Sequence, residues 1–130
     1  MTRGLLDTSV FIARQGRGLD SSRLPDEIAV SVITYGELRA GVLAATELSV
    51  QSRRLTTLQA VAELNPLPID SSVAAAWAEL RLGIARSGRR MNVNDSWIAA
   101  TALAHDVPLV SQDADFDAFA EVSPLRVIRV

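Results

Sequence analysis

Short apolar runs alternate with stretches of helical periodicity along this chain, and this alternation restricts the possible fold more than any other feature. We expect strands at the apolar runs 4–6, 28–33, 66–69, 107–110 and 125–130. We expect helices at 8–15, from 34 onward, at 47–63, from 73 onward, at 95–105 and at 114–120. Strands that alternate with helices favour right-handed crossovers and a parallel sheet. The sequence therefore predicts an α/β fold of three layers, with helices on both faces of the sheet.

The size and composition agree with one small globular domain. The chain has 130 residues, of which 48% are hydrophobic and 22% are charged, so we expect a single domain over residues 1–130 with a substantial core. It has no cysteine, which excludes disulfides, thiolate zinc sites and cysteine nucleophiles. No secretory signal or membrane-spanning stretch is recognisable. We therefore expect a cytoplasmic protein with no membrane partner.

Acidic residues stand close to the ends of the predicted strands or at the beginnings of the helices. They are Asp7, Glu37, Asp95, Asp113 and Asp115. The carboxyl ends of parallel strands meet at one edge of a sheet, and this edge is where open α/β sheets bind their ligands. We therefore expect these acids to point toward the same edge of the molecule.

Each acid also has a purely structural explanation, because acids and small polar residues are favoured at helix N-termini. Thr34 and Glu37 have the spacing of a capping box, and Asn92 and Asp95 have the same spacing. Ser111 is the equivalent candidate cap for the helix over 114–120. A cap explains one acid at a time, whereas it does not explain why all of them fall at one edge.

A cluster of carboxylates implies a particular chemistry. Carboxylates within a few ångströms of one another repel, so the cluster needs protons or a cation to be stable. Ligands that are all oxygens, without histidine or cysteine, suit Mg²⁺ or Mn²⁺ rather than zinc. Such an ion can generate hydroxide and stabilise both the phosphoryl oxygens and the leaving oxygen of a phosphodiester. The acids therefore predict metal-assisted hydrolysis with Mg²⁺ or Mn²⁺ as cofactor.

Four segments carry these acids, at positions 5–10, 31–38, 95–100 and 109–116, and they read LLDTSV, SVITYGEL, DSWIAA and LVSQDADF. Together and in this order they resemble the motifs of PIN-domain nucleases, especially toxins of the VapC type. The resemblance implies strand order 3-2-1-4-5 and a divalent-metal site that cleaves RNA. The acidic core that it implies consists of Asp7, Glu37, Asp95 and Asp113. Asp115 is then either a fifth metal ligand or the residue that takes the role of Asp113.

The same resemblance implies further residues and partners. Thr8 and Ser111 resemble the hydroxyl positions beside the metal. A toxin of this type has a cognate antitoxin, and we expect a homodimer and a hetero-oligomer with that antitoxin, formed through apolar surface of the helices over 38–48 and 55–64. Arg89 and Arg90 lie in a loop before the third motif, from which they could reach RNA phosphates.

Two other acids also lie after a predicted strand or near the beginning of a helix, and we expect both to have only a structural role. In the implied strand order, Asp70 follows a strand two places away from that of Asp7, which puts it roughly 10 Å from Asp7. We therefore expect Asp70 to cap a helix. Asp117 lies one turn further into its helix than Asp113, and we expect its side chain to be solvated.

The sequence leaves two alternative functions. One is another Mg²⁺-dependent phosphohydrolase, of the haloacid-dehalogenase or receiver kind. Such proteins usually need a lysine, and all thirteen basic residues of this chain are arginines. The other is a catalytically silent PIN-like module that only binds a partner. Loss of an acid would have supported that alternative, but all four positions of the acidic core are filled.

Overall fold

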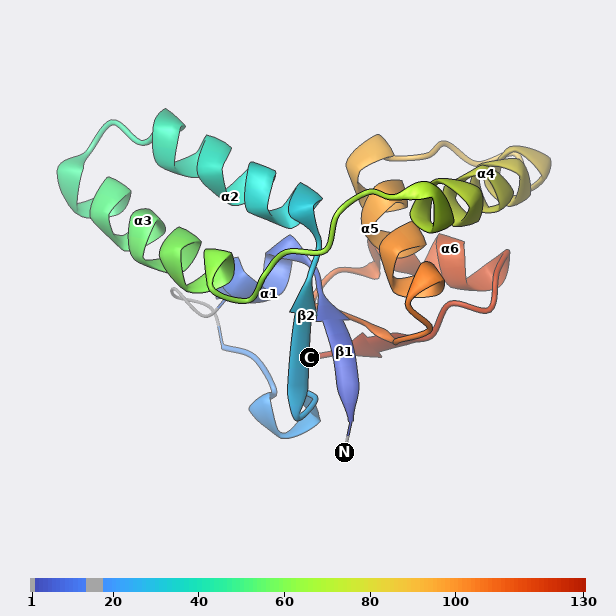
Figure 1. Ribbon diagram of the computed structural model, residues 1–130, viewed down its shortest axis with the longest axis horizontal. Helices are drawn as coiled ribbons and strands as arrows, with labels where there is room; N and C mark the ends of the chain where they lie inside the picture. Colours follow the sequence, from blue (N-terminus) through green and yellow to red (C-terminus); the bar gives the residue numbers. More distant parts are fainter. Residues whose placement is uncertain (1, 14–17) are drawn as a thin grey trace.

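The computed structural model describes residues 2–13 and 18–130, and a parallel sheet lies at its centre (Figure 1). The strands are β1 (Arg3–Leu6), β2 (Glu27–Val30), β3 (Leu109–Ser111) and β4 (Val127–Arg129). They lie in the order β2-β1-β3-β4, and every pairing is parallel. Parallel neighbours cannot be joined by a tight hairpin, so the chain crosses over between strands through helical segments.

Helices cover both faces of the sheet. In Figure 1 the hairpin of α2 and α3 lies on one side of the strands, and α4, α5 and α6 lie on the other. The helices are α1 (Thr8–Ala13), α2 (Val32–Ala44), α3 (Leu48–Ala62), α4 (Ser71–Arg86), α5 (Val93–Ala104) and α6 (Asp117–Glu121), with short 3-10 turns η1 (Ser21–Arg23) and η2 (Ala114–Phe116). The predicted three-layer α/β fold is confirmed.

Neighbouring residues of the central strand pack into separate halves of the core. Leu5 belongs to a cluster with Ile98 of α5, whereas Leu6 belongs to a cluster with Leu38 of α2. Both leucines are fully buried, because successive side chains of a strand point to opposite faces and both faces are covered. This packing fixes the end of β1, and with it the position of the next residue, Asp7.

The third of the five predicted strands does not form. Leu67 makes only one bridge beside the end of β2, in which its N–H donates to the Val30 carbonyl at 2.8 Å and its carbonyl accepts from Val32 N–H at 3.0 Å. The ladder stops on both sides, because Asn65 has a left-handed φ of 53° and because the chain opposite Leu67 enters helix α2 at Val32. The implied five-stranded order is therefore corrected to four strands, which keep their expected relative order.

Helix α2 begins at Val32, two residues earlier than predicted. Its N-cap is Ser31, whose hydroxyl oxygen accepts a hydrogen bond from Ile33 N–H at 3.0 Å. Thr34 therefore lies inside the helix, and the interpretation of Thr34 and Glu37 as a capping box is wrong. The prediction placed the helix start too late because β-branched residues favour strands.

The other predicted helices are present, with differences at their ends. The helix predicted over 8–15 is α1 as far as Ala13, and its last two positions lie outside the described residues. The segment 114–120 is divided between η2 and α6. In the described part of the chain, no helix has the length and apolar character needed to cross a membrane.

Candidate active site

Three strands end level with one another, which brings the residues that follow them to one edge of the sheet. Leu6, at the end of β1, pairs with Val30 of β2 on one side and with Val110 of β3 on the other. The next residue is Asp7, whose N–H donates to the Val110 carbonyl at 3.0 Å. Asp7 therefore lies at the middle of the carboxyl edge of the sheet.

The side chain of Asp7 is held almost entirely away from solvent. It is 4% exposed, and the Ser9 hydroxyl donates to its Oδ1 at 2.6 Å. Burial raises the pKa of Asp7 to about 6, against the effect of hydrogen bonds from Ser9 and Ser111, and the negative charge of Asp113 adds to the rise. The ionised form of Asp7 is therefore disfavoured when no cation is near it.

Ser9 is a residue of the site that the sequence analysis did not single out. Its Oγ lies 3.4 Å from Ser111 Oγ and accepts a hydrogen bond from Gln112 N–H at 3.1 Å. Ser9 therefore joins Asp7 to the segment that carries Asp113. Its signal in the sequence is the Asp-x-Ser spacing, since a hydroxyl two residues away from an acid can form a local hydrogen bond with it.

Glu37 reaches the site from the second turn of α2. The Thr8 hydroxyl donates to Glu37 Oε1 at 2.7 Å, and the same hydroxyl oxygen lies 3.1 Å from Thr34 Oγ1. Thr34 is fully buried, so these contacts join the beginning of α1 to α2. The structure therefore places the hydroxyl of Thr8 against the carboxylate of Glu37.

The pKa of Asp95 is raised by burial and by the negative charges of the other four predicted acids. It lies in the first turn of α5, where its N–H donates to the N-cap side chain of Asn92 at 3.1 Å, as the sequence predicted. Burial is the main cause that raises the pKa of Asp95 to about 6. The second cause is the negative charge of neighbouring carboxylates, which are, in decreasing order of effect, Glu37, Asp7, Asp115 and Asp113. We call Asp95 and these four acids, whose charges act on it, the acidic cluster.

Asp113 and Asp115 enter this cluster from η2. Asp113 is half-buried at the N-cap position of η2 and makes no capping bond with its side chain, while Asp115 is exposed. The hydroxyl of Ser111 accepts a hydrogen bond from Asp113 N–H at 2.9 Å, so Ser111 acts as a local cap. Asp113 raises the pKa of both Asp7 and Asp95, whereas Asp115 contributes to that of Asp95.

The two acids expected to be structural lie outside the cluster. Asp70 is the N-cap of α4, and its Oδ1 accepts a hydrogen bond from Val73 N–H at 3.0 Å. This bond is the main cause that lowers the pKa of Asp70. Asp117 is exposed on α6 and pairs with Arg129 at 3.3 Å. Both predictions are confirmed.

The acidic cluster fits a hard divalent cation in charge and in donor type. In the described part of the chain, the arginine ion pairs engage Glu121, Asp106 and Asp117, and none of them engages the five acids. Within residues 2–13 and 18–130, no three or more acidic or histidine side chains lie close enough together to hold a metal ion by themselves. Mg²⁺ commonly keeps several waters and takes one or two carboxylates, so it needs no complete protein cage.

The raised pKa values predict how the metal-free protein responds to pH. Asp7 and Asp95 keep their protons in the folded state up to about pH 6, whereas in the unfolded chain they lose them near pH 4. The folded state therefore binds more protons in this window, and its stability falls as the pH rises. In EDTA we expect the melting temperature to be about 4 °C higher near pH 5.5 than near pH 8. Mg²⁺ should reduce this difference, and a melting temperature that rises with pH in EDTA would contradict the prediction.

Comparison with known proteins identifies the family of the chain. Residues 4–122 match the family described as the PIN domain. Ribonuclease VapC5 of Mycobacterium tuberculosis is 48% identical to this chain over 128 residues, which cover 98% of this chain and 95% of the relative. Ribonuclease VapC4 of the same organism is 43% identical over 126 residues, which cover 96% of this chain and 97% of the relative.

A solved structure agrees in fold and in sequence. It is the crystal structure of VapBC-5 from Mycobacterium tuberculosis, a member of the VapBC family of toxin-antitoxin systems. It aligns with a TM-score of 0.92 at 45% identity, and the alignment covers 100% of both chains. The chain therefore belongs to the PIN-domain family. Within this family, its relatives include the ribonucleases VapC5 and VapC4.

Proposed function

We propose that this chain is an endoribonuclease that hydrolyses RNA phosphodiester bonds and acts as the toxin of a toxin-antitoxin pair. The observation that carries the proposal is that four carboxylates, from three other segments of the chain, lie near enough to Asp95 for their charges to raise its pKa. Such a cluster is suited to a divalent cation and to phosphodiester hydrolysis. The names of the relatives, Ribonuclease VapC5 and Ribonuclease VapC4, support the same class of reaction.

The residues of the cluster would hold Mg²⁺ or Mn²⁺. Asp7 and Asp95 have raised pKa values, and a cation beside them would keep both carboxylates ionised at neutral pH. Ser9 orients Asp7, and Thr8 orients Glu37, so these carboxylate oxygens are fixed before any ligand arrives. When bound, the cation would supply Lewis-acid activation of water and of the scissile phosphate.

Removal of the cation tests this proposal. We expect the purified protein to cleave RNA in Mg²⁺ or Mn²⁺ and to lose cleavage in Ca²⁺ or in excess EDTA, because Ca²⁺ prefers more ligands and longer bonds. A labelled RNA followed by gel electrophoresis measures this, with Mg²⁺ restored to the EDTA-treated sample as control. Cleavage that persists in excess EDTA would contradict the metal mechanism. Dependence on zinc would also contradict it, since the acids offer only oxygen ligands.

The proposed partners are a cognate antitoxin and a second copy of this chain. The solved relative belongs to a family of toxin-antitoxin systems. The hairpin of α2 and α3 projects away from the sheet (Figure 1), and near the turn that joins these helices Leu43 is 73% exposed and Leu48 is 80% exposed. Apolar surface of this kind favours protein contacts. An RNA substrate and the absence of cysteine both fit the cytoplasm as the compartment.

Association in solution gives a separate prediction. We expect the chain alone to form a homodimer at tens of micromolar and a larger complex with its co-encoded antitoxin, in which RNA cleavage is suppressed. Sedimentation velocity gives the masses, and the RNA assay gives the inhibition. A chain that stays monomeric at these concentrations and that no co-encoded protein inhibits would contradict the proposed partners.

A further inference from the structure

A shallow pocket of about 310 Å³ opens beside the acidic cluster. Its polar lining includes Arg90 and Asn92 together with the acids Asp95 and Asp115, and Ile84 and Phe119 contribute apolar surface. The wall of the pocket therefore contains one arginine of the loop before α5 and two of the five acids. A volume near 300 Å³ is at the small end of ligand sites and is sufficient for one phosphate with part of its sugar.

The loop that carries Arg90 is held at both ends. Gly88 ends helix α4 with a φ of 73°, a left-handed conformation that glycine adopts without strain. Asn92 caps α5 at the other end of the loop. Between them, Arg89 pairs with Glu121 of α6 at 2.6 Å. Arg89 is therefore engaged away from the pocket, whereas Arg90 lines it.

The guanidinium of Arg90 has no ion-pair or hydrogen-bond partner among the residues that the structure describes. An RNA backbone approaching the site meets an acidic cluster on a chain whose net charge is −2, so phosphates that do not contact the cation are repelled. A free guanidinium offsets this repulsion and can bind two phosphate oxygens at once.

We propose that Arg90 binds a phosphate of the RNA backbone in this pocket and so positions the strand across the acidic cluster. This proposal rests on the ribonuclease activity proposed above. A contact of this kind acts on the bound substrate and on the transition state alike, because the phosphate is not the one that reacts. It should therefore affect KM more than kcat.

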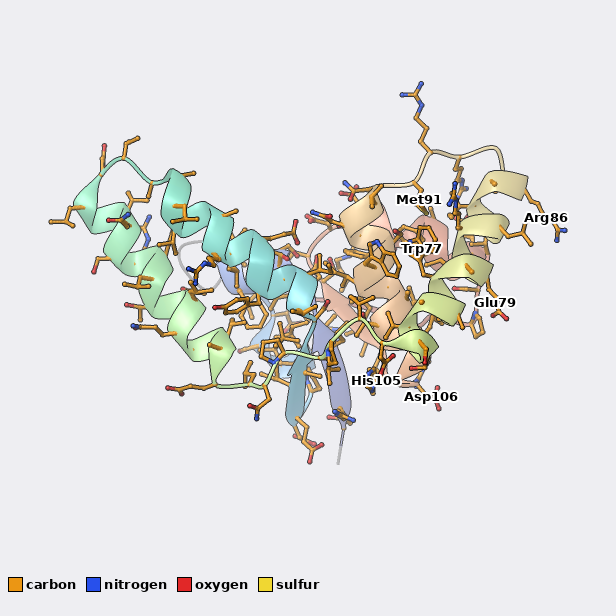
Figure 2. All side chains as sticks on the ribbon, turned by 45° about the horizontal axis from the view of Figure 1, so that its top comes forward. Trp77, Glu79, Arg86, Met91, His105 and Asp106 are labelled. Atoms are coloured by element: carbon orange, nitrogen blue, oxygen red, sulfur yellow. The ribbon has the colours of Figure 1, made fainter. Side chains whose placement is uncertain are left out.

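The variant that tests the proposal is Arg90→Ala, with Arg86→Ala as its matched control. Both substitutions remove one exposed positive charge. Figure 2 shows Arg86 pointing outward from the last turn of α4, and Arg86 is not among the residues that line the pocket. RNA cleavage is measured over a range of salt concentrations. Binding of a fluorescein-labelled RNA is measured in EDTA, where no cleavage occurs, and melting temperatures verify that both variants fold.

We expect Arg90→Ala to raise KM about tenfold, with kcat changed less than about threefold. One lost contact to single-stranded RNA should also reduce the slope of log affinity against log salt by about 0.7. RNA binding in EDTA should weaken to a similar degree. Arg86→Ala should match the unmodified protein. Arg90→Lys keeps the charge and should recover part of the lost affinity.

The proposal is overturned if Arg90→Ala matches Arg86→Ala in KM and in salt slope, or if Arg90→Lys is as weak as Arg90→Ala. It is also overturned if Arg90→Ala weakens only the antitoxin complex, since Arg90 would then serve a protein carboxylate. In each of these cases the ribonuclease function stands. If the unmodified protein fails to cleave RNA in Mg²⁺, the proposed function fails, while RNA binding in EDTA still decides the role of Arg90.

Discussion

Asp7→Asn is expected to lower RNA cleavage by about a thousandfold, which corresponds to about 4 kcal/mol of transition-state stabilisation. Asparagine has the shape of aspartate, and its amide oxygen can still accept the hydrogen bond from Ser9 that Asp7 accepts at 2.6 Å. The substitution therefore removes a negative charge with little change in packing. Without that charge the cluster should hold the proposed divalent cation poorly, because a neutral amide is a weaker ligand for a hard cation.

The same variant should be more stable than the unmodified protein when no metal is present. Burial raises the pKa of Asp7 to about 6, so at pH 8 the folded state carries an unfavourable charge that asparagine lacks. We expect a melting temperature in EDTA that is several degrees higher. A loss of cleavage together with a gain in stability identifies a functional residue, whereas a loss of both would indicate a structural one.

Asp106→Asn is the matched control for this experiment. Asp106 is fully exposed and lies at the end of α5 opposite Met91 (Figure 2). Its φ of 51° is a left-handed conformation that asparagine tolerates well. The control removes one negative charge outside the acidic cluster and should keep full activity. Equal loss of cleavage in the two variants would contradict a specific role for Asp7.

Glu37→Gln is expected to lower cleavage by about a hundredfold, or about 2.7 kcal/mol. Glutamine can still accept the hydrogen bond that Thr8 donates to Glu37 Oε1 at 2.7 Å. Helix α2 should keep its beginning, because Ser31 provides its cap. The loss of charge should therefore act on the cation and leave the helix unchanged.

Glu79→Gln is the control for Glu37→Gln. Glu79 is exposed on α4 and is labelled on the outer side of that helix in Figure 2. Cleavage and melting temperature, each with and without Mg²⁺, are compared for the three proteins. A fully active Glu37→Gln that still responds to Mg²⁺ would remove Glu37 from the site.

The order of strands and helices, and the acids that lie near the strand ends, could be predicted from the sequence, because both depend on local patterns. Alternating apolar runs and helical periodicity indicate a parallel sheet with helices on both faces, and the structure confirms it. Acids placed after strands on this sheet come to one edge. The structure accordingly brings Asp7, Glu37, Asp95, Asp113 and Asp115 into one cluster.

Helical spacing was a poorer guide to the surroundings of single residues. The helical spacing of Trp77 with Val73 and Leu80 predicts a position on the buried stripe of its helix, but Trp77 is half-buried. Its ring stacks on Trp97 at 4.5 Å between centroids, and its Nε1 donates to Ser96 Oγ at 2.9 Å. Indole has an N–H that needs a partner when it is buried. Periodicity predicts which face of a helix a residue occupies, but it does not predict which residue accepts a hydrogen bond from a polar group such as the indole N–H.

The sequence by itself determined the α/β class, the order of the acidic segments and the type of ligand atom they offer. Only the tertiary structure decided that Ser9 holds Asp7 and links it to Ser111, that Thr8 holds Glu37, and that Arg90 rather than Arg89 lines the pocket. The physical reason is that most of these contacts join residues far apart in the chain. Thr8 and Glu37, for example, are separated by 29 positions. Such pairs are set by the parallel register of β1 with β2 and β3, which local propensity does not encode.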